Sequence, residues 1–352
     1  MQRRQAVGLL SLLPLAPLVP LTAAFGLAGC AREQPYQRLE GATMGTRYRI
    51  HFQPPARSFD AAALQAAMDA RLEALNASLS TYRPDSLITA FNEAPVGRAM
   101  PIDADFEHML ALSRQVHQAS GGAFDPTVGA LVNLWGFGWP KPDQPLTRLP
   151  DPAAIQAARG RFDAVEQPAP GQLRKRAPLR LDFSAIAKGY GVDLMAEVLR
   201  KQGVQHFMAE IGGEVATLGK GPTGGPWRIG IEAPDPVVTG RVLTRVHLSE
   251  GALATSGNYR NFFELEGRRF SHIIDPVSGY PVAQPPVSVS VIAPNVALAD
   301  AWATAFMVLD EEPGLALAEA NQLAVYWVYH DNQGQRTRQS SRMQPYLDAA
   351  QP

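Results

Sequence analysis

The sequence predicts an α+β fold, from three observations. Three long segments space their apolar residues like one face of a helix, and four short segments alternate like half-buried strands. The two kinds of segment follow one another in irregular order, which favours α+β over a doubly wound parallel sheet. With 352 residues, 46 % of them hydrophobic, the chain has enough apolar material for one large or two small cores.

Helices are predicted over residues 59–79, 103–119 and 184–202. Gly121 and Gly122 follow the second and Gly203 follows the third, and glycine commonly terminates helices because it adopts the left-handed conformation. Strands are predicted over residues 48–52, 227–231, 287–292 and 323–329. Two Pro-rich stretches, residues 139–152 and 167–178, are expected to be surface connections.

The first thirty residues are typical of a bacterial lipoprotein signal peptide. Arg3 and Arg4 precede an apolar stretch that three prolines interrupt and that ends in Leu27-Ala28-Gly29-Cys30. An uncleaved N-terminal membrane anchor is the alternative, but the prolines and the small residues before the cysteine favour cleavage after residue 29. Cys30 would then carry the lipids that tether the protein to a membrane. Both Sec and Tat export stay open.

Composition excludes several kinds of site. Cys30 is the only cysteine, so the chain has no internal disulfide and no Cys-type zinc site. The chain carries 32 basic and 33 acidic residues, and removal of the signal peptide takes away Arg3 and Arg4 and leaves 30 against 33. A net charge of about −3 argues against nucleic acid as the partner.

Two segments near the C-terminus combine a base with oxygen donors. Asp300 and Thr304 are four residues apart in an apolar run, so on a helix both side chains would lie on the same face. A carboxylate and a hydroxyl are donors suited to Mg²⁺, and His272, one short strand earlier, is a candidate base. Each residue also has an ordinary alternative, since an aspartate often caps a helix and a single histidine is often a packed, hydrogen-bonded residue.

Three more segments are suited to a phosphate-bearing ligand. In residues 181–190 a strand leads Asp182 into a helix start with Lys188 nearby, which brings N–H donors, a carboxylate and an ammonium together. Gly212 and Gly213 end a strand and would let the backbone approach a ligand closely. Residues 255–259 form another small, polar bend. The alternatives are an aspartate-capped helix and ordinary turns.

These five segments, with four others, resemble one family, the FAD:protein FMN transferases, also called the ApbE or flavin transferase family. The resemblance runs over residues 41–329, and all nine motifs occur in the family's order. The four other motifs are Thr43-Met44-Gly45-Thr46, Leu79-Ser80-Thr81-Tyr82, Gly122-Ala123-Phe124-Asp125-Pro126-Thr127 and Asn133-Leu134-Trp135-Gly136-Phe137-Gly138.

The resemblance implies a fold and an activity. The expected architecture is ApbE-type (T-fold-like), with antiparallel sheets packed against helices. Its expected parts are a signal peptide (1–29), a lipidated tether (30–40), a flavin transferase catalytic domain (41–330) and a C-terminal tail (331–352). Such enzymes bind FAD, split its pyrophosphate with Mg²⁺, and attach FMN through a phosphoester to a threonine, sometimes a serine, of a target flavoprotein, with release of AMP.

The resemblance also assigns residues. The implied FAD contacts are Met44, Tyr82, Ala123, Phe124, Asp125, Asp182, Lys188 and Ile274. Mg²⁺ would be bound by the backbone carbonyl of Ala185 with Asp300 and Thr304. His272 is the candidate to take the proton of the acceptor hydroxyl. Some members place a second aspartate three residues after the first, where this chain has Ala303, so the number of metal ions is open. Lys188 stands where some members have an acidic residue.

The acceptor is not identified by the residues. The resemblance suggests subunits of Na⁺-translocating NADH:quinone reductase, of Rnf-type electron-transport complexes, or regulators of anaerobic respiration. The expected location is the periplasmic face of a bacterial membrane, with the inner membrane favoured. The alternative functions are a Mg²⁺-dependent FAD pyrophosphatase, a flavin-binding lipoprotein without turnover, and a structural envelope lipoprotein.

Overall fold

The computed structural model describes residues 34–139, 141, 146–234, 240–259, 261–331 and 334–348. The predicted signal peptide and Cys30 lie outside the described residues. The helices are α1 (Ala61–Leu79), α2 (Leu87–Glu93), α3 (Ala104–Ala119), α4 (Gly129–Leu134), α5 (Pro152–Ala158), α6 (Ala187–Lys201), α7 (Val296–Val308) and α8 (Glu311–Ala320). None of these helices is long and apolar enough to cross a membrane.

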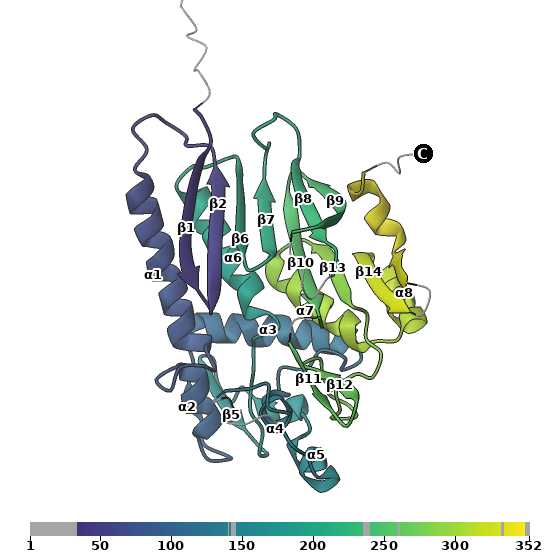
Figure 1. Cartoon of the computed structure of the whole chain (residues 1–352). Helices are drawn as coiled ribbons and strands as arrows, with labels where there is room; N and C mark the ends of the chain where they lie inside the picture. The colour runs from purple at the N-terminus through teal and green to yellow at the C-terminus, as the bar shows by residue number, and fades with distance from the viewer. Residues whose placement is uncertain are drawn as a thin grey trace, which may run out of the picture. The chain divides into compact units, whose positions relative to one another are not determined.

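The centre of the fold is an eight-stranded sheet in the order β1-β2-β6-β7-β10-β13-β14-β15, and every neighbouring pair is antiparallel (Figure 1). Its strands are β1 (Gln37–Thr43), β2 (Thr46–Phe52), β6 (Phe207–Ile211), β7 (Glu214–Leu218), β10 (Gly251–Gly257), β13 (Ser288–Ala293), β14 (Ala324–Asp331) and β15 (Gly334–Gln339). The predicted α+β class with antiparallel pairing is confirmed.

Smaller sheets complete the fold. Strands β8 (Trp227–Glu232) and β9 (Val242–Leu248) form one hairpin, and β11 (Phe262–Leu265) and β12 (Arg268–Ser271) form another. Strands β3 (Met100–Pro101), β4 (Val165–Glu166) and β5 (Gln172–Lys175) form a third small sheet.

Strands β13 and β14 of the central sheet are buried on both faces by different elements, whereas β2 alternates between buried and more exposed residues. Because successive side chains of a strand point to opposite faces, Val325 and Trp327 of β14 pack in the core shared with α3 and α7. Tyr326 and Val328 of the same strand pack with the β8–β9 hairpin, which Figure 1 shows in front of the sheet. Strand β14 is therefore apolar on both faces, and the prediction that it would be half-buried is wrong.

Four sequence predictions differ from the structure at element boundaries. The sheet begins at Gln37, inside the predicted tether, and the stretch 167–178 contains strand β5 with Leu173 buried. The predicted tail contains β15, an edge strand whose polar residues lack the apolar alternation of a central strand. Helix α6 begins at Ala187 rather than residue 184, because the Asp182 side chain accepts from the Ser184 N–H and holds a turn there.

Helices α6 and α7 stabilise each other's N-termini. Asp193 of α6 accepts from the backbone N–H groups of Val296 (2.8 Å) and Ala297 (2.9 Å) at the start of α7. Asp300 of α7 accepts from the Gly189 N–H of α6 at 3.1 Å. Helix α6 has no side-chain cap of its own, so this carboxylate serves one of the N–H groups that a helix start leaves unpaired.

The two helices approach so closely that only glycine fits at position 189. A Cβ atom there would lie 2.4 Å from the carbonyl oxygen of Val296. Elsewhere in a helix, alanine is more stable than glycine by about 1 kcal/mol. Here the added methyl group would have to separate two backbones.

We expect Gly189→Ala to destabilise the protein by about 1–3 kcal/mol, because overpacking outweighs the gain in helix propensity. Urea denaturation followed by circular dichroism measures the change. Gly225→Ala is the matched control, because a Cβ atom there meets nothing within 4 Å. A Gly189→Ala protein as stable as the control would contradict the tight crossing.

Candidate active site

A cavity of about 630 Å³ gathers segments from the whole length of the chain. All the predicted FAD, metal and base residues except Met44 line it. They are Tyr82, Ala123, Phe124, Asp125, Asp182, Ala185, Lys188, His272, Ile274, Asp300 and Thr304. The structure therefore brings together residues that are up to 222 positions apart, from Tyr82 to Thr304.

Met44 is the exception among the predicted contacts. With Gly45 it forms the tight β1–β2 turn, in which both residues have positive φ. Its side chain extends to α6, where its Cε atom lies 3.0 Å from the position that a Cβ atom on Gly191 would occupy. Its contact with FAD stays a prediction.

The cavity wall includes a buried cluster of charges. Asp300 is 2 % exposed and lies on α7, and its Oδ1 is 3.9 Å from the Lys188 Nζ. Lys188, in the first turn of α6, also pairs with Oε1 of Glu214 at the start of β7. Burial raises the pKa of Asp300, against the opposing effects of Lys188 and the Gly189 N–H. Burial also raises the pKa of Glu214 to about 7.

Further hard oxygen donors line the same cavity. Thr304 lies one turn after Asp300, as the four-residue spacing predicts, and its hydroxyl is 3.3 Å from the hydroxyl of Ser256 on β10. Ala185, whose carbonyl is a predicted metal ligand, lines the same cavity. Among the described residues, no group of three or more His, Cys, Asp or Glu side chains is placed to hold a metal. The predicted donor set contains only one carboxylate.

His272 is held in a defined tautomer. Its Nδ1 lies 3.1 Å from the carbonyl oxygen of Asn261. Because a carbonyl only accepts hydrogen bonds, Nδ1 carries the proton and Nε2 is the basic nitrogen. Burial lowers the pKa of His272 below its ordinary value of 6.5, and the charge of Lys188 acts in the same direction. The imidazole is therefore neutral at physiological pH.

Asp125 belongs to a compact polar turn. Its Oδ1 accepts from the Thr127 N–H (2.7 Å) and hydroxyl (2.5 Å), and its Oδ2 lies 3.8 Å from Nδ1 of His117. Burial raises the pKa of this carboxyl, although the hydrogen bonds from Thr127 oppose the shift. These contacts orient the side chain at the cavity wall.

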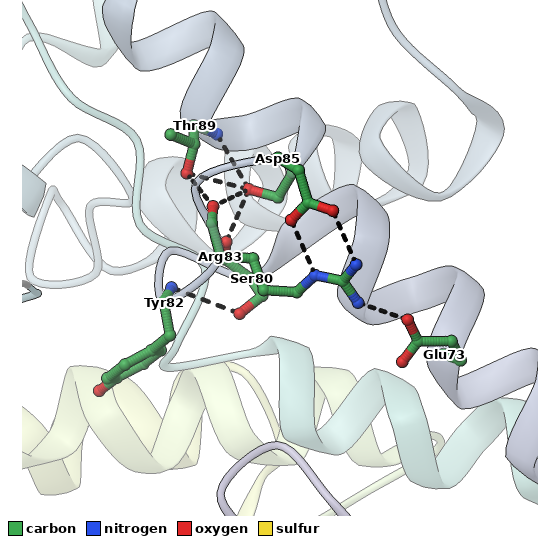
Figure 2. Close-up of polar contacts among 7 residues, drawn as sticks. Glu73, Ser80, Tyr82, Arg83, Asp85 and Thr89 are labelled. Carbon is green, nitrogen blue, oxygen red and sulfur yellow. Dashed lines mark hydrogen bonds and ion pairs between the residues drawn. The ribbon is translucent and has the colours of Figure 1, made fainter.

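Two exposed aromatic rings line the cavity at another point. Tyr82 is 53 % exposed, Trp139 is 46 % exposed, and their ring centroids are 5.6 Å apart. The loop that carries Tyr82 is held by a polar network (Figure 2), in which Arg83 bridges Asp85 and Glu73 while the Tyr82 N–H donates to Ser80. The Tyr82 ring points away from this network.

The sequence profile of the ApbE family matches residues 44–327. The chain belongs to the ApbE family. It is 39 % identical over 323 residues to a Vibrio cholerae protein named FAD:protein FMN transferase, covering 91 % of this chain and 96 % of that one. A Haemophilus influenzae protein of the same name is 36 % identical over 327 residues, covering 90 % and 93 %.

Solved structures of the family have the same fold. The apo form of the Pseudomonas stutzeri flavinyl transferase ApbE superposes with a TM-score of 0.82 at 37 % identity, covering 90 % of this chain and 98 % of that one. The Vibrio cholerae flavin transferase ApbE gives a TM-score of 0.80 at 36 % identity, covering 89 % and 100 %. The predicted ApbE-type architecture is confirmed.

Two residues of this ApbE-family site were not among the sequence candidates. Glu214 pairs with Lys188, and Asn92 of α2 hydrogen-bonds both backbone groups of Leu181. Neither stands in a pattern that a single sequence reveals, because the partner of Asn92 is 89 positions away and that of Glu214 is 26 positions away. Asn92 fixes the backbone directly before Asp182.

We expect Asn92→Ala to destabilise the protein by about 2–4 kcal/mol, because it leaves the buried N–H and C=O of Leu181 unpaired. Thermal and urea unfolding measure this change. Asn92→Asp, which keeps the acceptor but loses the donor, should fall between the alanine variant and wild type. Equal stability of all three proteins would contradict the positioning role of Asn92.

Proposed function

We propose that this protein transfers the FMN part of FAD to a threonine, or serine, hydroxyl of a target flavoprotein, with Mg²⁺ and with release of AMP. One observation carries the proposal: a single cavity combines buried oxygen donors, an ammonium group and a neutral histidine. The names of the relatives, FAD:protein FMN transferase, support the same reaction.

Different parts of the cavity lining suit the phosphates and the ring of FAD. Lys188, near the N-terminus of α6, is placed to bind phosphate oxygens. The exposed rings of Tyr82 and Trp139, which are tilted by 45° to each other, offer apolar faces to the isoalloxazine ring. Phe124 and Ile274 add buried apolar residues to the cavity wall.

The chemistry of the donor set fits Mg²⁺. The Asp300 carboxylate, the Thr304 hydroxyl and the Ala185 carbonyl are hard oxygen donors, and Mg²⁺ takes its other ligands from water and phosphate. When bound, the metal would neutralise charge on the pyrophosphate. Asp300 is already oriented by the Gly189 N–H, so one of its oxygens is held while the other faces Lys188.

His272 would act on the acceptor. Its neutral Nε2 takes the proton of the threonine hydroxyl, whose oxygen forms a bond to the phosphorus of the FMN half. The bond from that phosphorus to the bridging oxygen breaks, and AMP leaves with that oxygen. The Asn261 carbonyl keeps Nδ1 protonated, and therefore Nε2 available, throughout.

Two parts of the proposal concern the surroundings of the enzyme. The acceptor would be a threonine-bearing subunit of a membrane electron-transport complex or a respiratory regulator. Lipids on Cys30 would anchor the enzyme to the periplasmic face of a bacterial membrane. A FAD pyrophosphatase would use the same cavity with water in place of the hydroxyl.

Transfer is tested by incubating the protein with FAD, Mg²⁺ and a candidate acceptor domain, followed by flavin fluorescence on a denaturing gel. We expect fluorescent acceptor with the wild-type enzyme, none with EDTA, and a loss of rate of about 10²–10⁴-fold with His272→Ala, because general base catalysis contributes that much. An acceptor with alanine at the target threonine is the control. Free FMN and AMP without labelled acceptor would indicate the pyrophosphatase, and unchanged FAD a binding protein.

The transfer rate should keep its maximum down to a pH below 6.5. His272 must be neutral to accept a proton, and burial lowers its pKa, so at saturating FAD and Mg²⁺ the contribution of the general base to the rate is lost as the pH falls through this depressed value. The measurement is kcat against pH at saturating FAD and Mg²⁺. A midpoint of the acid limb above 6.5 would contradict this assignment of the base.

A further inference from the structure

Glu214 is a buried carboxylate in the cavity wall to which the proposed reaction gives no role. It begins β7 directly after Gly212 and Gly213, and its side chain is 3 % exposed. Its Oε1 pairs with Lys188, while its Oε2 is buried without a hydrogen-bond partner among the described residues. A half-satisfied buried carboxylate costs stability, which points to a function that retains it.

Lys188 lies between two carboxylates at unequal distances. Its Nζ makes a direct hydrogen bond to Glu214, but it is 3.9 Å from Oδ1 of Asp300, beyond hydrogen-bonding distance. Without the carboxylate of Glu214, Asp300 would be the nearest anion, and the Lys188 ammonium would form an ion pair with it. Glu214 therefore keeps Lys188 away from the predicted metal ligand.

The residue at position 303, an alanine, bears on the balance of charge around Asp300. Position 303 adds no second carboxylate to this face of α7, and the ammonium of Lys188 is the positive charge beside Asp300. We propose that Glu214 is a positioning residue, whose carboxylate holds the Lys188 ammonium apart from Asp300 so that it contacts the pyrophosphate of the substrate as a second positive charge. This inference rests on the proposed function.

A positioning role and simple electrostatics predict opposite effects of neutralising Glu214. Removing a negative charge close to an anionic pyrophosphate should strengthen its binding by Coulomb's law. Loss of the charged contact that positions Lys188 should weaken FAD binding, because a neutral acceptor at position 214 competes less well with the Asp300 carboxylate for the ammonium. The sign of the change in FAD affinity therefore separates the two roles.

The experiment compares FAD with riboflavin, which has the same ring and no phosphate. Binding to the purified full chain is measured by flavin fluorescence in EDTA, so that no metal or turnover contributes. We expect Glu214→Gln to weaken FAD binding about tenfold or more, while riboflavin affinity changes less than about twofold. Unchanged or stronger FAD binding, or an equal loss for both ligands, would overturn the proposal.

Glu197→Gln is the matched control. Glu197 also pairs with a lysine of α6, Lys201, but both side chains are exposed, at 54 % and 71 %. This variant removes the same charge from a Glu–Lys pair and should leave both affinities unchanged. A control that weakens FAD binding as much as Glu214→Gln would also overturn the proposal.

A double variant covers the case in which Glu214→Gln does not fold. Glu214→Gln with Lys188→Met removes both members of the Glu214–Lys188 pair, and it should lose the preference for FAD over riboflavin to the same extent as Lys188→Met alone. A retained preference would show that Lys188 does not bind the pyrophosphate, and would thereby refute the positioning role of Glu214, which acts through Lys188. If instead the wild-type protein bound riboflavin as tightly as FAD, the proposed phosphate site itself would be wrong.

Discussion

The crossing of α6 and α7 is the contact on which the site depends. Asp193 of α6 accepts from two N–H groups at the start of α7, and Asp300 of α7 accepts from Gly189 of α6. Each helix thus supplies the carboxylate that the other's N-terminus needs. Burial raises the pKa of Asp193 to about 6, so the contact keeps a carboxyl group in a place where its charge is opposed.

This crossing places the functional side chains as a consequence of its geometry. Lys188 precedes Gly189, and Thr304 follows Asp300 by one turn, so the ammonium, the carboxylate and the hydroxyl face one cavity. A larger residue at position 189 would move both helices, and the charge cluster with them. The glycine at position 189 is therefore required both for the close packing of the helices and for the arrangement of the charged side chains in the site.

The sequence predicted what depends on local spacing. The four-residue spacing of Asp300 and Thr304 places both on one face of α7, and apolar periodicity located α1 and α3 to within two residues at each end. The Asp182 turn before α6 and the edge strand β15 were missed because a side-chain hydrogen bond and the edge of a sheet leave no apolar pattern.

Contacts across long sequence separations could not be predicted. Asp193 is 103 positions from Val296, and Asn92 is 89 positions from Leu181. In the sequence, Asp193 is one polar residue in an amphipathic helix and Asn92 lies near a helix end. Their roles can be recognised only in the folded protein, in which the backbone groups of Val296, Ala297 and Leu181 lie within hydrogen-bonding distance of these side chains. The family resemblance supplied the site residues that spacing alone left open.

The His272 base and the carboxylate cluster are in their active protonation states over different ranges of pH. Asp300 and Glu214 with Lys188 carry a formal surplus of one negative charge, and burial raises the pKa of both carboxyl groups. Protons therefore compete with any cation for the cluster, and cation binding should strengthen as the pH rises. Burial moves His272 in the opposite direction and keeps it neutral at lower pH. Burial thus keeps the His272 base neutral at lower pH. Protonation of the carboxylate cluster, rather than of the histidine, therefore weakens cation binding in acid.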